Sequence, residues 1–284
     1  MLMWDDVKRY RAVAYRSRRD LRVTTKEEAI AYVEERGFVM FWPIKGILMP
    51  SLWAAVVGDR TVPNDHDDPG HVTWGWKDSL LGQRRWYYAK ILRRKATILS
   101  LNLAPAFYAL SENFGSPEED YIRQYRDGTL TVEAKAIYEA LLREGPLHTL
   151  ALRRAVSMTD RKAGYRFNRG LEELQADFKV MPVGVAEAGA WNYAFIYECV
   201  HRHHPELSEK ARRIKIGEAQ QILVNRYLRS VGAAQLRDVR KVFRWPKRDI
   251  QRALAALTAS GKLVDNAEIE GKAGEWVVSS ELSL

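Results

Sequence analysis

The sequence holds a single cysteine, Cys199, in 284 residues. One thiol excludes a disulfide framework and a multi-cysteine zinc site. The sequence also lacks a glycine-rich phosphate loop, a Gly-x-Ser-x-Gly elbow and a His-Glu-x-x-His helix, which argues against a conventional nucleotide hydrolase, serine hydrolase or zinc protease. Its function therefore has to be sought outside these enzyme classes.

Long hydrophobic runs are missing as well. The longest apolar stretch, residues 46–57, is interrupted by Pro50 and Ser51 and is too short to span a bilayer. Acidic residues stand at positions 5 and 6, before the apolar run of a secretory signal could form. These features predict a cytoplasmic protein without a membrane partner.

Positive charge is what the chain has in excess. Its 45 Lys and Arg residues outnumber 36 Asp and Glu residues, for a formal net charge of +9, and 46% of its residues are hydrophobic. That hydrophobic fraction is typical of a globular protein, and the length fits roughly two domains at about 150 residues each. The basic excess indicates a polyanion as partner.

The second half of the sequence contains an internal repeat. Residues 167–176 align with residues 250–259, 83 positions further on (250 − 167), and Arg, Leu, Leu and Ala recur at matching places. A Gly-x-Trp sequence follows each copy, at Trp191 and Trp276, and a glycine precedes each, at Gly145 and Gly232. Agreement of three features in one order indicates two copies of one structural module.

The predicted elements have the same order in both copies: a helix ending in glycine, a short helix, a third helix and a two-stranded hairpin. The first copy places them at 132–144, 149–156, 166–176, 179–183 and 191–195, and the second at 218–230, 236–243, 247–259, 263–267 and 275–278. Three helices followed by a β-hairpin wing are typical of winged helix-turn-helix modules. We therefore predict a helix-rich α+β fold of tandem winged helix-turn-helix units with short β-hairpin wings.

This prediction divides the chain into an N-terminal basic and aromatic domain, residues 1–128, and two winged helices, residues 129–205 and 206–284. Within the first domain, residues 26–57 are the candidate for a third, divergent copy. Thr25 and Glu28 have capping-box spacing, a periodic helix ends at Gly37, and residues 38–42 are typical of a buried strand.

Basic and amide side chains gather on the third helix of each copy, the element that reads the major groove in modules of this type. The predicted nucleic-acid contacts there are Arg166, Asn168 and Arg169 in the first copy and Lys247, Arg248, Gln251 and Arg252 in the second. The alternative is a solvated basic face on modules that pair with each other or with a protein.

A third basic set surrounds Trp86, Tyr87 and Tyr88, on a helix predicted to begin near Leu80. Its members are Arg84, Arg85, Lys90, Arg93, Arg94 and Lys95. Basic residues mixed with aromatic ones suit a track that binds phosphates and stacks on bases. The alternative is that the aromatic side chains belong to the core.

Acidic residues concentrate in one polar loop and just after it. Asp65, His66, Asp67 and Asp68 lie in the loop, and Asp78 follows. Several carboxylates attract hard cations, but the spacing is not that of a calcium-binding EF-hand loop, so we expect no metal and no cofactor. The group offers candidate general acids and bases, and the alternative is a solvated loop.

The paired modules, together with Glu-Arg-Gly-Phe-Val-Met-Phe-Trp at residues 35–42, resemble a known family. It is the AlkZ/YcaQ-type winged-helix DNA glycosylases, which excise bulky alkylated purines and unhook interstrand crosslinks. The similarity extends from about residue 26 to residue 278. It implies tandem winged-helix units around a concave, basic surface that binds double-stranded DNA.

The resemblance also locates the family's catalytic signature, Gln-x-Gln or Gln-x-Asp, directly after the Gly-Phe-Val entry. Here the matching positions hold Met40 and Trp42. A thioether and an indole N–H cannot orient or deprotonate the attacking water. The departure removes the catalytic side chains that the family uses but does not affect the predicted fold. Any catalytic group therefore has to come from elsewhere in the sequence, and the candidates lie between Asp65 and Asp78.

Three functions follow from these observations. The first is a monomeric DNA-binding protein of the glycosylase-like family that recognises damaged or distorted duplex, with catalysis lost or altered. The second is an active glycosylase for alkylated or crosslinked purines. The third is a winged-helix transcription regulator, a class that usually forms symmetric dimers with one reading module per chain.

Overall fold

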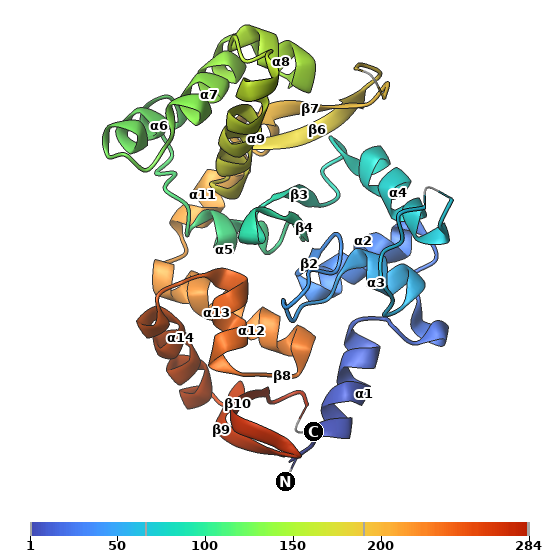
Figure 1. Cartoon of the computed structure of the whole chain (residues 1–284). Coiled ribbons are helices and arrows are strands. Elements are labelled where there is room, and N and C mark those ends of the chain that lie inside the picture. Colours follow the sequence, from blue (N-terminus) through green and yellow to red (C-terminus); the bar gives the residue numbers. More distant parts are fainter. Residues whose placement is uncertain (1, 66, 190, 283–284) are drawn as a thin grey trace.

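The computed structural model describes residues 2–65, 67–189 and 191–282. His66, one of the predicted acid–base residues, lies outside the described residues. Figure 1 shows a central region built around a small sheet, with a helical region packed on either side of it. Among the described residues, no helix combines the length and the apolar character that crossing a bilayer requires.

The N-terminal half supplies the central region and the helices beside it. Its elements are β1 (Leu2–Met3), α1 (Trp4–Ala14), η1 (Arg19–Leu21), α2 (Lys26–Arg36), β2 (Phe38–Met40), α3 (Leu52–Val57), η2 (Pro69–His71), α4 (Val72–Leu80), β3 (Tyr87–Lys90), η3 (Leu92–Arg94), β4 (Ala96–Leu99), α5 (Ala104–Tyr108) and α6 (Pro117–Arg126). The predicted capping box is confirmed, because the Thr25 hydroxyl accepts from the Glu28 N–H and the Glu28 carboxylate accepts from the Thr25 N–H. Gly37, at φ 79°, ends α2.

The central antiparallel sheet, in the order β2-β4-β3, lies between two hydrophobic cores. Successive strand residues point to opposite faces. Phe38, Tyr87 and Leu99 accordingly join one core, and Val39 and Tyr88 join the other. Because both faces of the sheet are covered, the strands have no polar face, and their sequences show no alternation of polar and apolar residues.

The predicted helix from Leu80 through residue 95 is wrong. This segment holds β3, η3 and β4, and Trp86, Tyr87 and Tyr88 are buried. The backbone turns into the left-handed region at Arg84 (φ 52°), just before β3, and again at Arg93 (φ 60°), just after it. Helical backbone cannot pass through such conformations, and bulky aromatic residues favour strands.

The second half contains the repeated elements. They are α7 (Val132–Glu144), β5 (Leu147–His148), α8 (Thr149–Ala155), α9 (Arg161–Ala176), β6 (Val180–Ala186) and β7 (Ala194–Cys199), then α10 (Val200–His203) and α11 (Glu206–Arg212), then α12 (Ile216–Val231), β8 (Ala233–Ala234), α13 (Leu236–Phe243), α14 (Lys247–Ala259), β9 (Leu263–Glu270) and β10 (Lys272–Ser279). Both copies have three helices followed by an antiparallel hairpin, as the sequence predicted. A short strand after the first helix pairs with each hairpin, giving the orders β5-β7-β6 and β1-β9-β10-β8.

The N-terminus is part of the last of these sheets. Strand β1 runs parallel to β9, with Leu2 opposite Ile269. The Arg11 guanidinium on α1 donates to the backbone oxygens of Val231 (2.9 Å) and Ala233 (2.7 Å). These bonds place the first helix against the C-terminal module, and Figure 1 shows both chain ends there.

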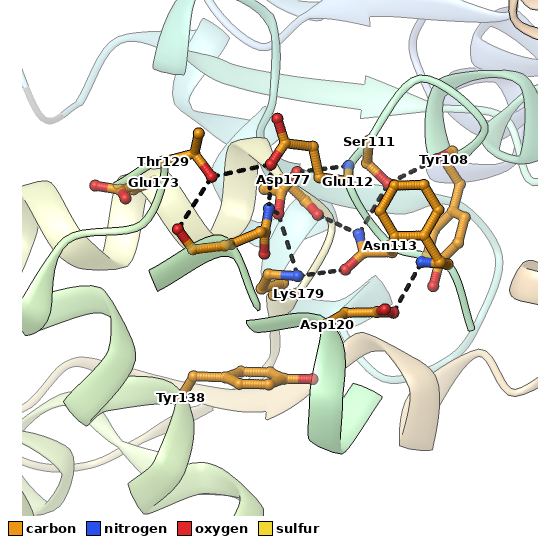
Figure 2. A network of polar contacts seen from close by, with 12 residues as sticks. Tyr108, Ser111, Glu112, Asn113, Asp120, Thr129, Tyr138, Glu173, Asp177 and Lys179 are labelled. Atoms are coloured by element: carbon orange, nitrogen blue, oxygen red, sulfur yellow. Dashed lines mark hydrogen bonds and ion pairs between the residues drawn. The ribbon is translucent and has the colours of Figure 1, made fainter. Parts of the chain in front are cut away.

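A buried polar network joins the loop before α6 to the turn after α9 (Figure 2). The Lys179 ammonium, 1% exposed, donates to the Asn113 side-chain oxygen at 2.5 Å and lies 3.3 Å from the Asp177 carboxylate. Asp177 also accepts from the Glu112 N–H and the Gln124 amide. Asp177 and Lys179 each contact more than one partner, so the network ties these two segments together.

Candidate nucleic-acid interface and aromatic site

Helix α9 presents its basic side chains to solvent. Its apolar residues Phe167, Leu171 and Leu174 recur at helical spacing and pack into the core with α7. The opposite face is exposed and carries Arg161, Lys162, Arg166, Asn168 and Arg169. The predicted contacts of the first copy therefore share one accessible, positively charged surface in the N-terminal half of the helix.

Helix α14 has the same arrangement. Ile250, Leu254 and Leu257 are buried, and the predicted contacts Lys247, Arg248, Gln251 and Arg252 are exposed. The Asp249 carboxylate lies 3.6 Å from the Arg248 guanidinium and 3.9 Å from that of Arg252. These surface pairs are weak and leave both guanidinium groups accessible to a phosphate.

The third basic set lies in the connections around β3. Arg84, Arg85, Arg94 and Lys95 are exposed, and Arg93 is partly exposed. Lys90 is an exception, because its ammonium pairs with Glu172 at 2.7 Å and its backbone N–H donates to Gln175. Since η3 packs against both α9 and α13, Arg93 and Arg94 lie between the two repeated modules.

The candidate acidic residues separate into two groups. Asp65 accepts from the Asp67 N–H at 3.1 Å, and Asp68 caps η2 and pairs with Arg60 at 2.6 Å, so these carboxylates shape the loop itself. Asp78 lies apart from them on α4. Among the described residues, no group of three His, Cys, Asp or Glu side chains is arranged to hold a metal ion.

The two positions that match the family's catalytic signature have different surroundings. Met40 is buried in the core, at 1% exposure. Trp42 is partly exposed and begins a cluster of rings that we call the aromatic site, made of Trp42, Trp53, His71, Trp74 and Tyr193.

Ring contacts connect the aromatic site from end to end. The Trp42 ring centroid lies 4.9 Å from that of Trp53 and 6.3 Å from that of Trp74, and Trp74 stacks on Tyr193 at 6.3 Å. Gly70 allows the backbone to pack closely on the Trp53 ring, since a Cβ at this position would meet that ring at 2.5 Å. Trp74 keeps 43% of its surface exposed. The site can therefore offer a ring face to a flat ligand.

A charged group lies at the Tyr193 end of the aromatic site. The Lys77 ammonium donates to the Tyr193 hydroxyl at 2.9 Å, and that hydroxyl donates to Asp78 Oδ1 at 2.9 Å. Lys77 also contacts Asp78 Oδ1 directly, at 2.7 Å. The Lys77 side chain is 3% exposed and lies 4.4 Å from the Phe195 ring centroid, whereas Asp78 keeps 25% of its side chain exposed.

Burial sets the protonation of this group. It lowers the pKa of Lys77 from its ordinary value, and the Asp78 carboxylate opposes that shift. Burial, together with the same carboxylate, raises the pKa of Tyr193. Tyr193 is thus a neutral hydroxyl that donates to the Asp78 carboxylate.

Sequence reasoning missed two residues of this arrangement. Lys77 shares a helix face with Trp74, three residues earlier, which is a signal that could have been read. Tyr193 comes from the loop between β6 and β7, 115 positions from Asp78, and no local pattern predicts such a contact. Strand β6 of this hairpin packs against α4.

Comparisons with known proteins agree with the predicted resemblance. Residues 23–244 match the model of a protein family described as AlkZ related. Among solved structures, the fold is similar to that of the Streptomyces sahachiroi DNA glycosylase AlkZ, with a TM-score of 0.60 and 13% sequence identity over 100% of this chain and 71% of that one. No curated protein matches the sequence.

Proposed function

Because the chain belongs to the AlkZ-related family, we propose that it is a glycosylase-like DNA-repair protein that binds double-stranded DNA and recognises damaged or distorted duplex. The cytoplasmic location and the monomeric state expected from the sequence are part of this proposal. The observation that carries it is the pair of third helices, α9 and α14, each with an exposed basic half and a buried apolar half.

We further assign each repeated unit as a winged helix-turn-helix module. The support is the order of the helices and the hairpin in both copies. In this assignment the third helix enters the major groove and the hairpin is the wing. The loop that joins β6 to β7 carries Trp191, which is 90% exposed. A large apolar side chain in that position suits insertion between base steps of a distorted duplex.

Catalysis is lost or altered in this proposal, because Met40 and Trp42 occupy the positions of the family's signature. An active glycosylase is the second candidate, and the observation in its favour is the Asp78 carboxylate beside the aromatic site. A transcription regulator is the third, and two modules in one chain fit it less well than they fit a monomeric repair protein.

Duplex binding tests the proposal. We expect the protein to bind a labelled duplex measurably at about 50 mM salt and to lose roughly a thousandfold in affinity by about 200 mM, because each neutralised phosphate releases counterions. Fluorescence anisotropy on undamaged, N7-alkylated and crosslinked duplexes measures the affinity and ranks the three ligands. Undetectable binding at the lower salt concentration would contradict the proposal.

A further inference from the structure

We infer that Asp78 is the catalytic carboxylate of a hydrolytic site for a nucleobase extruded from duplex DNA, with Lys77 and Tyr193 as its positioning residues and Trp42 and Trp74 as its stacking surface. The inference rests on the proposed function, since it needs a bound duplex. It goes further by assigning the chemistry to residues outside the family's signature.

The position of Asp78 is the first argument. Trp42 stands where the family's signature would end, and its ring lies 6.3 Å from that of Trp74, one turn before Asp78 on the same helix. Trp74 in turn stacks on Tyr193, whose hydroxyl donates to Asp78. A continuous chain of contacts therefore links the signature position to a carboxylate that comes from another element.

The state of the carboxylate is the second argument. Lys77 and Tyr193 both contact Oδ1, and within the described parts of the chain Oδ2 has no partner. Two donors on one oxygen fix the orientation of the carboxylate and leave the other oxygen to accept a proton from water. A carboxylate that is oriented by two contacts and a quarter exposed meets the geometric needs of a general base.

The surroundings indicate the class of ligand. Trp74 is 43% exposed, and Trp42 is partly exposed beside it. Indole faces bind flat rings by stacking, and they attract a ring that carries positive charge. An extruded purine meets both conditions, most strongly when alkylation has made it cationic.

In the proposed step, the bond between the deoxyribose C1′ and the base nitrogen breaks, and its electron pair leaves with the base. A water oxygen forms the new bond to C1′. Asp78 accepts one proton of this water and then releases it to solvent. With an N7-alkylated purine the electron pair cancels the positive charge of the base, so the leaving group needs no proton, and nothing is oxidised or reduced.

Single-turnover base release tests the inference on the same three duplexes, undamaged, carrying N7-methylguanine and crosslinked. The intact protein should release the modified base above the spontaneous rate. Asp78→Asn should lower that rate by about a hundredfold or more, the size of effect seen when one group that acts on the transition state is removed. Duplex affinity measured by anisotropy should stay within about twofold, because a catalytic defect changes rate and spares binding.

Two further variants complete the design. Asp127→Asn makes the same chemical change at an exposed position at the end of α6, and release should be unchanged. Tyr193→Phe keeps the ring and removes one donor to Asp78, so release should slow about tenfold at unchanged affinity. If Asp78→Asn does not fold, Tyr193→Phe decides, because an unchanged release rate in that variant overturns the inference.

The outcomes separate the two proposals. Tight duplex binding with release at only the spontaneous rate on all three duplexes overturns the catalytic inference and leaves the proposed function standing. Equal release by the intact protein and Asp78→Asn also overturns it. Absence of duplex binding refutes the proposed function itself, and the inference falls with it.

Discussion

Replacing Arg161, Arg166 and Arg169 together by glutamine is expected to weaken duplex binding by about a hundredfold at 50 mM salt. All three side chains are exposed on one face of α9. Each phosphate contact that is lost lowers the slope of log affinity against log salt by about one, so the triple variant should lose about three. The loss should be similar for every duplex sequence, since these contacts read phosphate.

Loss of net positive charge anywhere on the protein would also weaken duplex binding, so the control variant must remove the same charge at another place. Replacing Arg18, Arg123 and Arg213 by glutamine does this, because each is at least half exposed and pairs with a nearby carboxylate. This triple variant should bind within about threefold of the intact protein. Equal losses in the two triple variants would show that α9 is not the contact surface.

Lys179→Met is expected to lower the free energy of unfolding by about 3 kcal/mol, the usual cost of removing one partner from a buried ion pair. The substitution preserves most of the side-chain volume. It leaves the Asp177 carboxylate and the Asn113 side-chain oxygen without the ammonium that both contact. The loss should appear as a lower urea midpoint, with the slope of the transition unchanged.

Lys8→Met is the matched control for that measurement. Lys8 pairs with Asp5 at 2.7 Å, but both side chains are mostly exposed, and exposed pairs contribute little. Lys8→Met should therefore leave the urea midpoint unchanged within experimental error. If Lys179→Met lowers the free energy of unfolding by less than about 1 kcal/mol, the network in Figure 2 does not stabilise the contact between its two segments as we expect.

The repeated modules could be predicted from sequence because their signals are local. Apolar residues recur at helical spacing through Ile250, Leu254 and Leu257, and Pro246 directly precedes the helix. The predicted helix at 247–259 accordingly has the bounds observed for α14. The exposed basic face follows from the same pattern, since it occupies the positions between the buried residues.

The segment around β3 was mispredicted for a physical reason. A strand buried on both faces has no alternation of polar and apolar residues. The run Trp86, Tyr87 and Tyr88 therefore lacks the period of two that would predict a strand. Basic residues on either side supported a helix that the backbone at Arg84 and Arg93 excludes. Only the pairing with β4, a tertiary contact, determines the structure of this segment.

The sequence predicts Asp78 as a candidate site residue, but it does not predict the two residues that contact Asp78. Asp78 was included with the loop aspartates because they are close in sequence, yet the structure places it on a helix with a different set of partners. Tyr193, which contacts it, comes from the loop between β6 and β7, 115 positions further along the chain. Long-range contacts between a hairpin and a helix leave no periodic trace in a single sequence.

The central claim is that the repeated modules and the aromatic site contact duplex DNA. Photocrosslinking to a duplex that carries 5-iododeoxyuridine tests it most directly, because this base crosslinks to aromatic side chains that touch it. The described exposed aromatic residues form two groups by the elements that carry them: Trp74 on α4, Tyr165 on α9 and Trp191 in the β6–β7 loop, and Phe114 and Tyr125 before and within α6. Our account predicts crosslinks, mapped by mass spectrometry, to the first group. Crosslinks confined to Phe114 and Tyr125 would contradict it.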